Sequence, residues 1–137
     1  MTIIQLSYKA GEVSVLNFYE LKLNNKDPVY LQIVMHVKRQ ILLRRAESGD
    51  KLPSRREVAA QLSVNPNTVQ KAFKLMEDEG FVRTSSTLGS VIYVDEAMFD
   101  RLEAELTKEM VTEFIQSAKE INLSFKKVVD LISEHWN

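Results

Sequence analysis

The sequence of 137 residues contains no cysteine, and this absence excludes several kinds of chemistry. Disulfide frameworks, zinc sites built on thiolates and cysteine nucleophiles all need that residue. A chain without cysteine also fits the reducing cytoplasm. No apolar run approaches the roughly 20 residues that a bilayer span requires, and the start MTIIQLSYKAGEV lacks the basic and then long-apolar order of a signal peptide. We therefore expect a cytoplasmic protein without a membrane partner.

Catalytic motifs are lacking as well. The two histidines, His36 and His135, are isolated, and no glycine-rich phosphate loop, metal-ligand spacing or nucleophile motif is present. The acidic stretches Asp95-Glu96 and Glu77-Asp78-Glu79 are typical of solvated surface. We expect neither an enzyme nor a bound cofactor or metal ion.

Charge is distributed unevenly, although the formal net charge is only −1. The segment 38–83 has ten Lys/Arg against six Asp/Glu, whereas 94–137 has five against ten. A basic middle with an acidic tail is expected when one part of a chain meets nucleic acid and another part has a different role. Such an excess is also common on ordinary solvated surfaces, so the motifs must decide.

The first 26 residues are the least informative. They mix short β-type runs, Thr2–Ser7 and Val13–Leu23, with a turn at Asn24-Asn25-Lys26. This extension could add a strand beside a sheet or cross to a partner chain, and the sequence does not choose between them.

Three helices are predicted next, in residues 27–80. The first begins at Asp27-Pro28, with Asp27 as the N-cap, and runs to about Arg45 on an apolar face of helical spacing. The second begins with the capping box Ser54-Arg55-Arg56-Glu57 and ends near Ser63. The third has Asn65 as its N-cap and Pro66 at its first position, and it stops at Gly80.

The third helix has a polar face that suits DNA. Asn67, Gln70, Lys71 and Lys74 follow one another at helical spacing, opposite an apolar stripe. In a major groove, Asn and Gln can bind adenine N6 and N7, and lysines meet phosphate or guanine. Any exposed helix has a polar face, so the surrounding elements matter. Two β-type runs, 81–84 and 91–94, follow as a hairpin with Gly89 in its loop, which completes a winged helix-turn-helix.

Four segments carry a resemblance to a known family. They are Pro28–Ile33, Gly49–Ala59, Val64–Ala72 and Glu77–Val82, which lie in the right order within 27–94. In these segments the chain resembles the DNA-binding domain of GntR-family bacterial transcription regulators, and its Asn65-Pro66-Asn67-Thr68 start and short acidic tail resemble the YtrA-like subfamily. We therefore expect an N-terminal extension (1–26), a winged helix-turn-helix domain (27–94) and a helical dimerisation tail (95–137) in a mainly α fold.

The resemblance also implies residue roles. Arg56 matches the family's phosphate- or base-contacting arginine at the start of the second helix, and Thr68 matches its phosphate-contacting threonine. Ser54 is expected to cap the second helix and also to touch a phosphate. Unlike many members, the chain has Arg55 in place of an acidic residue and no basic residue between Thr84 and Gly89 in the wing. The predicted DNA-contacting residues are Ser54, Arg55, Arg56, Asn65, Asn67, Thr68, Gln70, Lys71, Lys74 and Gly89.

The tail is expected to form two helices, the second capped by Ser124. The first has an apolar stripe that is too long for a small domain to bury, and dimerisation is its best use because two-fold dimers read palindromes. The stripe consists of Phe99, Leu102, Leu106, Met110 and Phe114.

The sequence thus predicts a homodimeric transcription regulator that binds a palindromic double-stranded operator. By resemblance, we expect a repressor that controls its own operon and neighbouring transporter genes. Two alternatives remain: a winged helix used as a protein-interaction module, and a sensor gated by a small-molecule effector. The operator, the effector, the regulated genes and the choice between repressor and activator cannot be read from the sequence.

Overall fold

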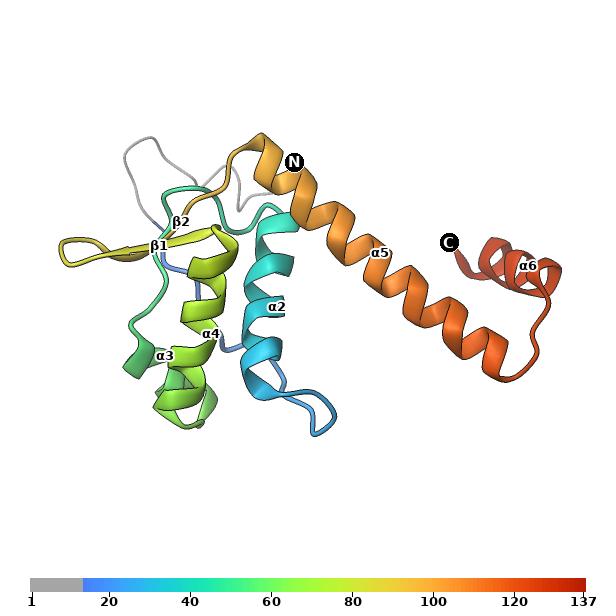
Figure 1. Cartoon of the computed structure of the whole chain (residues 1–137), viewed down its shortest axis with the longest axis horizontal. Coiled ribbons are helices and arrows are strands. Elements are labelled where there is room, and N and C mark those ends of the chain that lie inside the picture. Colours follow the sequence, from blue (N-terminus) through green and yellow to red (C-terminus); the bar gives the residue numbers. More distant parts are fainter. Residues whose placement is uncertain (1–13) are drawn as a thin grey trace. The chain divides into compact units, whose positions relative to one another are not determined.

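The computed structural model describes residues 14–137 of the chain (Figure 1). They form two compact units, one that ends at Asp100 and one that covers Arg101–Asn137. The elements are α2 (Val29–Leu42), α3 (Arg55–Leu62), α4 (Pro66–Glu79), β1 (Val82–Ser85), β2 (Gly89–Ile92), α5 (Glu96–Glu120) and α6 (Phe125–His135). The predicted mainly α class, with three helices, a hairpin and two further helices, is confirmed.

Helix α2 begins one residue later than predicted, because Pro28 is its N-cap and makes no side-chain cap bond. The cap expected from Asp27 is therefore wrong. Instead, the side chain of Gln32 holds the preceding loop. Its Nε2 donates to the carbonyl oxygens of Asn24 (3.0 Å) and Asp27 (2.8 Å), and its Oε1 accepts from the Asn24 N–H (2.9 Å).

The caps of α3 and α4 follow the prediction. Ser54 and Glu57 form the reciprocal capping box, and Asn65 caps α4 with Pro66 at its first position. Gly80 ends α4 with φ +95°, a left-handed conformation that costs glycine little. All three predictions are confirmed. Each concerns an interaction between residues close together in the sequence, which the sequence itself contains.

Both strands of the hairpin lie closer to the turn than predicted. They pair antiparallel from Val82 with Ile92 to Ser85 with Gly89. The exposed residues 84 and 85 belong to β1 although their side chains are polar, because a strand is defined by the hydrogen bonds of its backbone. Ser85 Oγ accepts from the Leu88 N–H at 3.0 Å and closes the turn.

The N-terminal extension enters the first unit. Lys51 bridges antiparallel to Val91 of β2 and parallel to Val15, with bonds of 2.9 Å from Leu16 N–H to Lys51 O and from Lys51 N–H to Ser14 O. For residues 14–23, the described part of the predicted β-type run Val13–Leu23, the prediction is wrong beyond this single bridge, because the chain turns at residues 19–20. The predicted run Thr2–Ser7 lies outside the described residues.

The core of the first unit explains why α4 exposes its polar face. Helices α2 and α3 and strand β1 pack on α4. The fully buried side chains include Ile33, Val37, Val58, Val69, Phe73, Met76, Phe81, Val82 and also Phe18 from the extension. The inner stripe of α4 is therefore used by the core, and its polar residues are left outside.

The second unit contains most of α5 and all of α6. Ser124 caps α6 as predicted, since its hydroxyl accepts from the Lys127 N–H at 3.1 Å. In the described structure α6 buries none of its residues, although apolar side chains line one face. Within residues 14–137 no helix is both long and apolar enough to span a bilayer.

Candidate nucleic-acid interface

An open hollow lies on the first unit where the N-terminal ends of α3 and α4 meet. Its lining residues are Ser54, Arg55, Arg56, Pro66, Asn67 and Gln70. All of them except Pro66 belong to the predicted contact set. The fold therefore brings together two stretches that are ten residues or more apart in sequence.

The caps determine the geometry of both helix ends. Ser54 Oγ accepts from the Glu57 N–H at 3.1 Å, and Glu57 Oε1 accepts from the Ser54 N–H at 2.8 Å. The hydrogen bond from the Ser54 N–H, followed by the interaction with the Ser54 side chain, lowers the pKa of the Glu57 carboxyl because both stabilise its charged form. In α4, Asn65 Oδ1 accepts from the Asn67 N–H at 2.7 Å. Helix N-termini carry partial positive charge, so two of them at one hollow suit a phosphate group.

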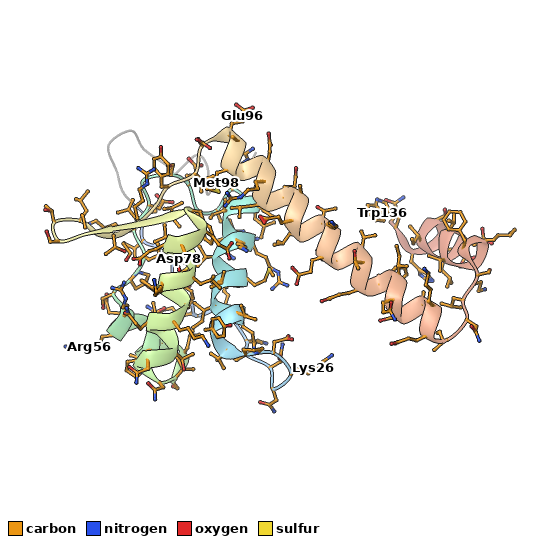
Figure 2. The ribbon with its side chains drawn as sticks, viewed as in Figure 1. Lys26, Arg56, Asp78, Glu96, Met98 and Trp136 are labelled. Carbon is orange, nitrogen blue, oxygen red and sulfur yellow. The ribbon has the colours of Figure 1, made fainter. Side chains whose placement is uncertain are left out.

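The two arginines at the start of α3 differ in their surroundings. Arg56 is exposed and extends outward from the helix (Figure 2). Arg55 is half-buried: its Nη2 lies 3.4 Å from Glu77 Oε2, and its guanidinium lies 4.9 Å from the centroid of the Phe73 ring. Arg55 Nε is buried without a hydrogen-bond partner among the described residues. Of the two, Arg56 is the better placed to meet an outside anion.

The outer face of α4 presents amides first and cations further along. Asn67, Gln70, Lys71 and Lys74 are all exposed, as their spacing predicts. Thr68 is half-buried, and its N–H donates to the Asn65 carbonyl at 3.0 Å. This face can therefore offer donors and acceptors to base edges near the helix start.

The lysines of this face have neighbours that hold them. Lys71 Nζ lies 4.1 Å from the centroid of the Tyr30 ring on α2. Lys74 Nζ lies 3.5 Å from Asp78 Oδ1, one helical turn further along α4. Both side chains remain exposed, so either cation can still meet a phosphate.

The end of α4 has three consecutive acidic residues, each paired with a cation from a different place. Glu77 pairs with Arg55 of α3, and Asp78, labelled in Figure 2, pairs with Lys74 of α4 itself. Glu79 lies 2.9 Å from Lys38 Nζ of α2. Carboxylates at a helix C-terminus are unfavourable with the helix dipole, and these pairs offset that cost.

The wing exposes hydroxyls and one cation that the sequence reasoning missed. Residues 84–89 are exposed, and Gly89 has φ +74° at the start of β2. Arg83 is exposed, with its guanidinium 3.3 Å from the centroid of the Tyr93 ring. Arg83 lies just before the segment Thr84–Gly89, where a basic residue was expected, and its place next to the buried Val82 in β1 indicates that it points outward.

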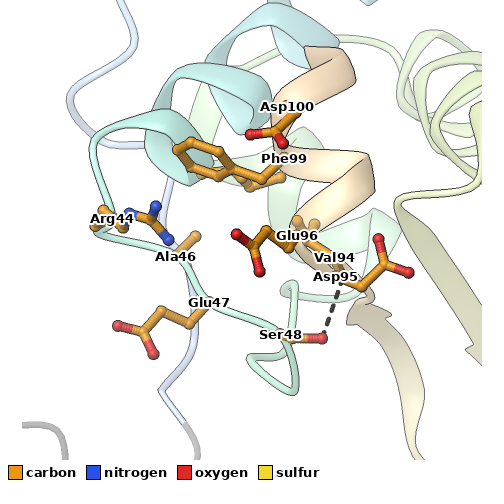
Figure 3. A pocket seen from close by; sticks show the side chains of 10 residues that line it. Arg44, Ala46, Glu47, Ser48, Val94, Asp95, Glu96, Phe99 and Asp100 are labelled. Atoms are coloured by element: carbon orange, nitrogen blue, oxygen red, sulfur yellow. Dashed lines mark hydrogen bonds between the residues drawn. The ribbon is translucent and has the colours of Figure 1, made fainter. Parts of the chain in front are cut away.

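A pocket of about 460 Å³ lies between the end of α2 and the start of α5 (Figure 3). Four carboxylates line it, from Glu47, Asp95, Glu96 and Asp100. Asp95 Oδ1 accepts from the Met98 N–H at 2.8 Å and caps α5. So many carboxylates repel phosphates, and this pocket does not extend the nucleic-acid interface.

The predicted dimerisation stripe divides by exposure. Phe99 is half-buried, with the Arg44 guanidinium 3.9 Å from its ring centroid. Leu102 and Leu106 are buried, whereas 65% of Met110 and 49% of Phe114 are exposed. The exposed apolar surface therefore begins later in α5 than the sequence stripe does.

Two helices joined by a turn at residues 63–65, with a hairpin wing and exposed amides and cations on the second helix, define a winged helix-turn-helix DNA-binding protein. The model of the "Bacterial regulatory proteins, gntR family" matches residues 29–92.

Similar proteins point to the same family. An uncharacterized HTH-type transcriptional regulator, YhcF of Bacillus subtilis, is 36% identical over 103 residues, which are 75% of this chain and 85% of YhcF. The HTH-type transcriptional repressor YtrA of the same organism is 36% identical over 109 residues, which are 78% of this chain and 83% of YtrA. A GntR-family regulator from Listeria monocytogenes has a similar structure, with TM-score 0.73 and 28% identity over 82% of this chain and 98% of that one. The chain belongs to the gntR family of bacterial regulatory proteins and is a DNA-binding transcription regulator.

Proposed function

We propose that the chain is a cytoplasmic, homodimeric repressor that binds a palindromic operator and controls its own operon and neighbouring transporter genes. The observation that carries the proposal is the hollow at the starts of α3 and α4, where cationic and amide side chains gather at two helix N-termini. The similarity to YtrA, which is named a repressor, favours repression over activation.

Two groups of contact residues have distinct roles in this proposal. Arg56, Ser54 and Thr68 meet phosphates and set the position of the domain on the duplex. Asn67 and Gln70, the exposed amides near the start of α4, read adenines in the major groove. Further contacts come from Asn65, Lys71, Lys74 and Gly89, with Gly89 acting through the backbone of the wing.

Dimerisation is assigned to the exposed apolar side chains of the tail. A monomer gains nothing by exposing so many large apolar groups, and a second copy could cover them. They are Met110, Val111, Phe114, Ile115, Ile121, Phe125, Val129, Ile132 and Trp136. Phe99, Leu102 and Leu106 of the predicted stripe are less exposed and are expected to support this surface rather than form it.

Selection of bound DNA from a random pool, followed by titration of the winning duplex at two salt concentrations, tests the DNA proposal. We expect a palindrome with A-rich half-sites about one helical turn apart. If a folded, full-length protein enriches no sequence, the repressor proposal is overturned in favour of the protein-interaction module or of a regulator that needs a small-molecule effector first.

Variants then separate the two groups of contacts. Arg56→Ala and Thr68→Ala should weaken binding to operator and random duplex alike, whereas Asn67→Ala should weaken mainly operator binding. Lys127→Ala, which removes an exposed cation from α6, is the control. If Asn67→Ala lost the same affinity for the operator and for the random duplex, the proposal that Asn67 contacts bases would be contradicted.

Sedimentation of tail variants tests the dimer. Phe114→Glu places a charge in the exposed apolar surface and should shift the chain toward monomer. Glu109→Lys changes charge at another exposed position of α5 and should leave the assembly intact. A wild-type chain that sediments as a monomer at micromolar concentration would contradict the proposal.

A further inference from the structure

The side chain of Glu77 connects three elements around the interface. Its Oε2 lies 3.4 Å from Arg55 Nη2 at the start of α3, and the same oxygen accepts a hydrogen bond from Thr84 Oγ1 of β1. Thr84 Oγ1 in turn lies 2.8 Å from Ser90 Oγ of β2. Thr84 and Ser90 are partners in the hairpin register. One carboxylate of α4 therefore reaches both α3 and the wing.

The hydrogen-bond directions in this group follow from the number of protons. A hydroxyl has one proton to donate, and Thr84 gives its proton to the carboxylate. The Ser90 hydroxyl, which is buried, must then donate to Thr84. A chain of two hydroxyls thus ends on an ionised acceptor, the arrangement in which hydrogen bonds are strongest.

Arg55 is held by the same group. Its guanidinium lies over the Phe73 ring, its Nη2 faces Glu77, and its Nε is buried. An arginine fixed in this way has less freedom to reach a phosphate than the exposed Arg56 beside it. Its main partner is the carboxylate of α4.

We propose that Glu77 is a positioning residue. Through its contacts with Arg55 and Thr84, it fixes the orientation of α3 and of the wing relative to the exposed polar face of α4. In this role Arg55 acts inside the protein and not on DNA, and Arg56 alone supplies the arginine contact of α3. The inference rests on the proposed operator binding, because only a specific complex needs α3, α4 and the wing in one register.

For the change in DNA affinity on replacing Glu77, the positioning role and a charge effect predict opposite signs. Glu77→Gln removes a negative charge from the DNA-binding unit, so a charge effect alone would strengthen binding to any duplex. Loss of a positioning contact should instead weaken binding to the selected operator by about tenfold while binding to random duplex stays equal or improves. Asp78→Asn is the matched control, since it makes the same charge change one residue away at an exposed pair with Lys74. It should not weaken operator binding.

Double-mutant cycles identify the members of the group. Arg55→Gln should lose operator affinity as Glu77→Gln does, and the two losses should not add. The salt slope of binding to random duplex should be unchanged by Arg55→Gln, whereas a phosphate contact would lower it by about one. Thr84→Val keeps the shape of the side chain, removes only the hydroxyl, and should also be non-additive with Glu77→Gln.

Amide hydrogen exchange of the free, full-length protein gives a second readout without DNA. Glu77→Gln should speed exchange in residues 82–92 relative to Asp78→Asn. If Glu77→Gln does not fold, Arg55→Gln and Thr84→Val decide by the same two measurements. The inference is overturned if Glu77→Gln behaves as Asp78→Asn does in both, or if Arg55→Gln lowers the salt slope and its loss adds to that of Glu77→Gln. Failure of the wild-type chain to select any operator would instead overturn the proposed function, and hydrogen exchange would still test the positioning role.

Discussion

Replacing Phe18 with alanine is expected to lower the free energy of unfolding of the first unit by about 3 to 5 kcal/mol. Phe18 lies before the residues that match the family model, which begin at Val29, yet its side chain is fully buried. Its ring centroid lies 5.0 Å from that of His36. The cost follows from the lost contacts of a buried aromatic ring and from the cavity left behind.

The magnitude has an upper limit set by the segment itself. The Phe18 N–H donates to Gln61 Oε1 at 2.9 Å, and this backbone bond survives the substitution. If residues 14–26 detached from the variant as a whole, the loss could not exceed the free energy with which they dock. Such detachment would also reduce the dependence of unfolding on denaturant, because less surface would remain to be exposed.

Urea titration at fixed protein concentration is the assay, because self-association would otherwise change the apparent stability. Far-ultraviolet circular dichroism follows helices of both units, whereas the only tryptophan, Trp136, reports on the second unit. Tyr19→Ala is the control, since 74% of that side chain is exposed, and it should change stability by less than about 0.5 kcal/mol. A loss below about 1 kcal/mol for Phe18→Ala would refute the idea that the extension completes the core.

Three further predictions concern caps, glycines and pH. Ser54→Ala and Ser124→Ala each remove a helix cap and should each cost about 1 kcal/mol in thermal unfolding, but only Ser54→Ala should also weaken DNA binding in a titration. Gly80→Ala and Gly49→Ala both force alanine to positive φ, +95° and +98°. Each should lower the free energy of unfolding by about 1 kcal/mol in a urea titration. A much larger loss for Gly80→Ala would mean that the new Cβ, 3.4 Å from Met98 Cε, does not fit. Burial lowers the pKa of His36 from 6.5, so the unfolded chain binds the proton more readily; the free energy of unfolding should fall as pH drops through 6.5, and His36→Asn should remove that part of the pH dependence.

Local signals in the sequence predicted the ends of α3 and α4 well. The Ser54 box, Asn65, Pro66 and Gly80 act on neighbours within a few residues, so the sequence contains both partners of each interaction. The start of α2 was missed because Gln32 reaches back to residues 24 and 27, a side-chain arrangement without a spacing rule.

Contacts between distant residues could not be predicted. Arg55 and Glu77 are 22 residues apart, and nothing in either neighbourhood indicates the other. The exposed amides and cations of α4 were predictable because helical spacing opposite an apolar stripe is a local property. The apolar stripe of the tail was predicted, but the burial of its residues was not. Spacing identifies an apolar face and does not show which of its residues other parts of the chain cover.

The three acidic residues at the end of α4 limit how this helix, which carries the proposed base contacts, could be transferred to another regulator. Glu77 and Glu79 depend on Arg55 of α3 and Lys38 of α2, and only Asp78 finds its cation within α4. Transplanted alone into another scaffold, α4 would bring two carboxylates without their partners close to a polyanion. The unit that can be transferred with its DNA preference is therefore the set of three helices, and a designer who wishes to move the specificity of this regulator should move Lys38 and Arg55 with it.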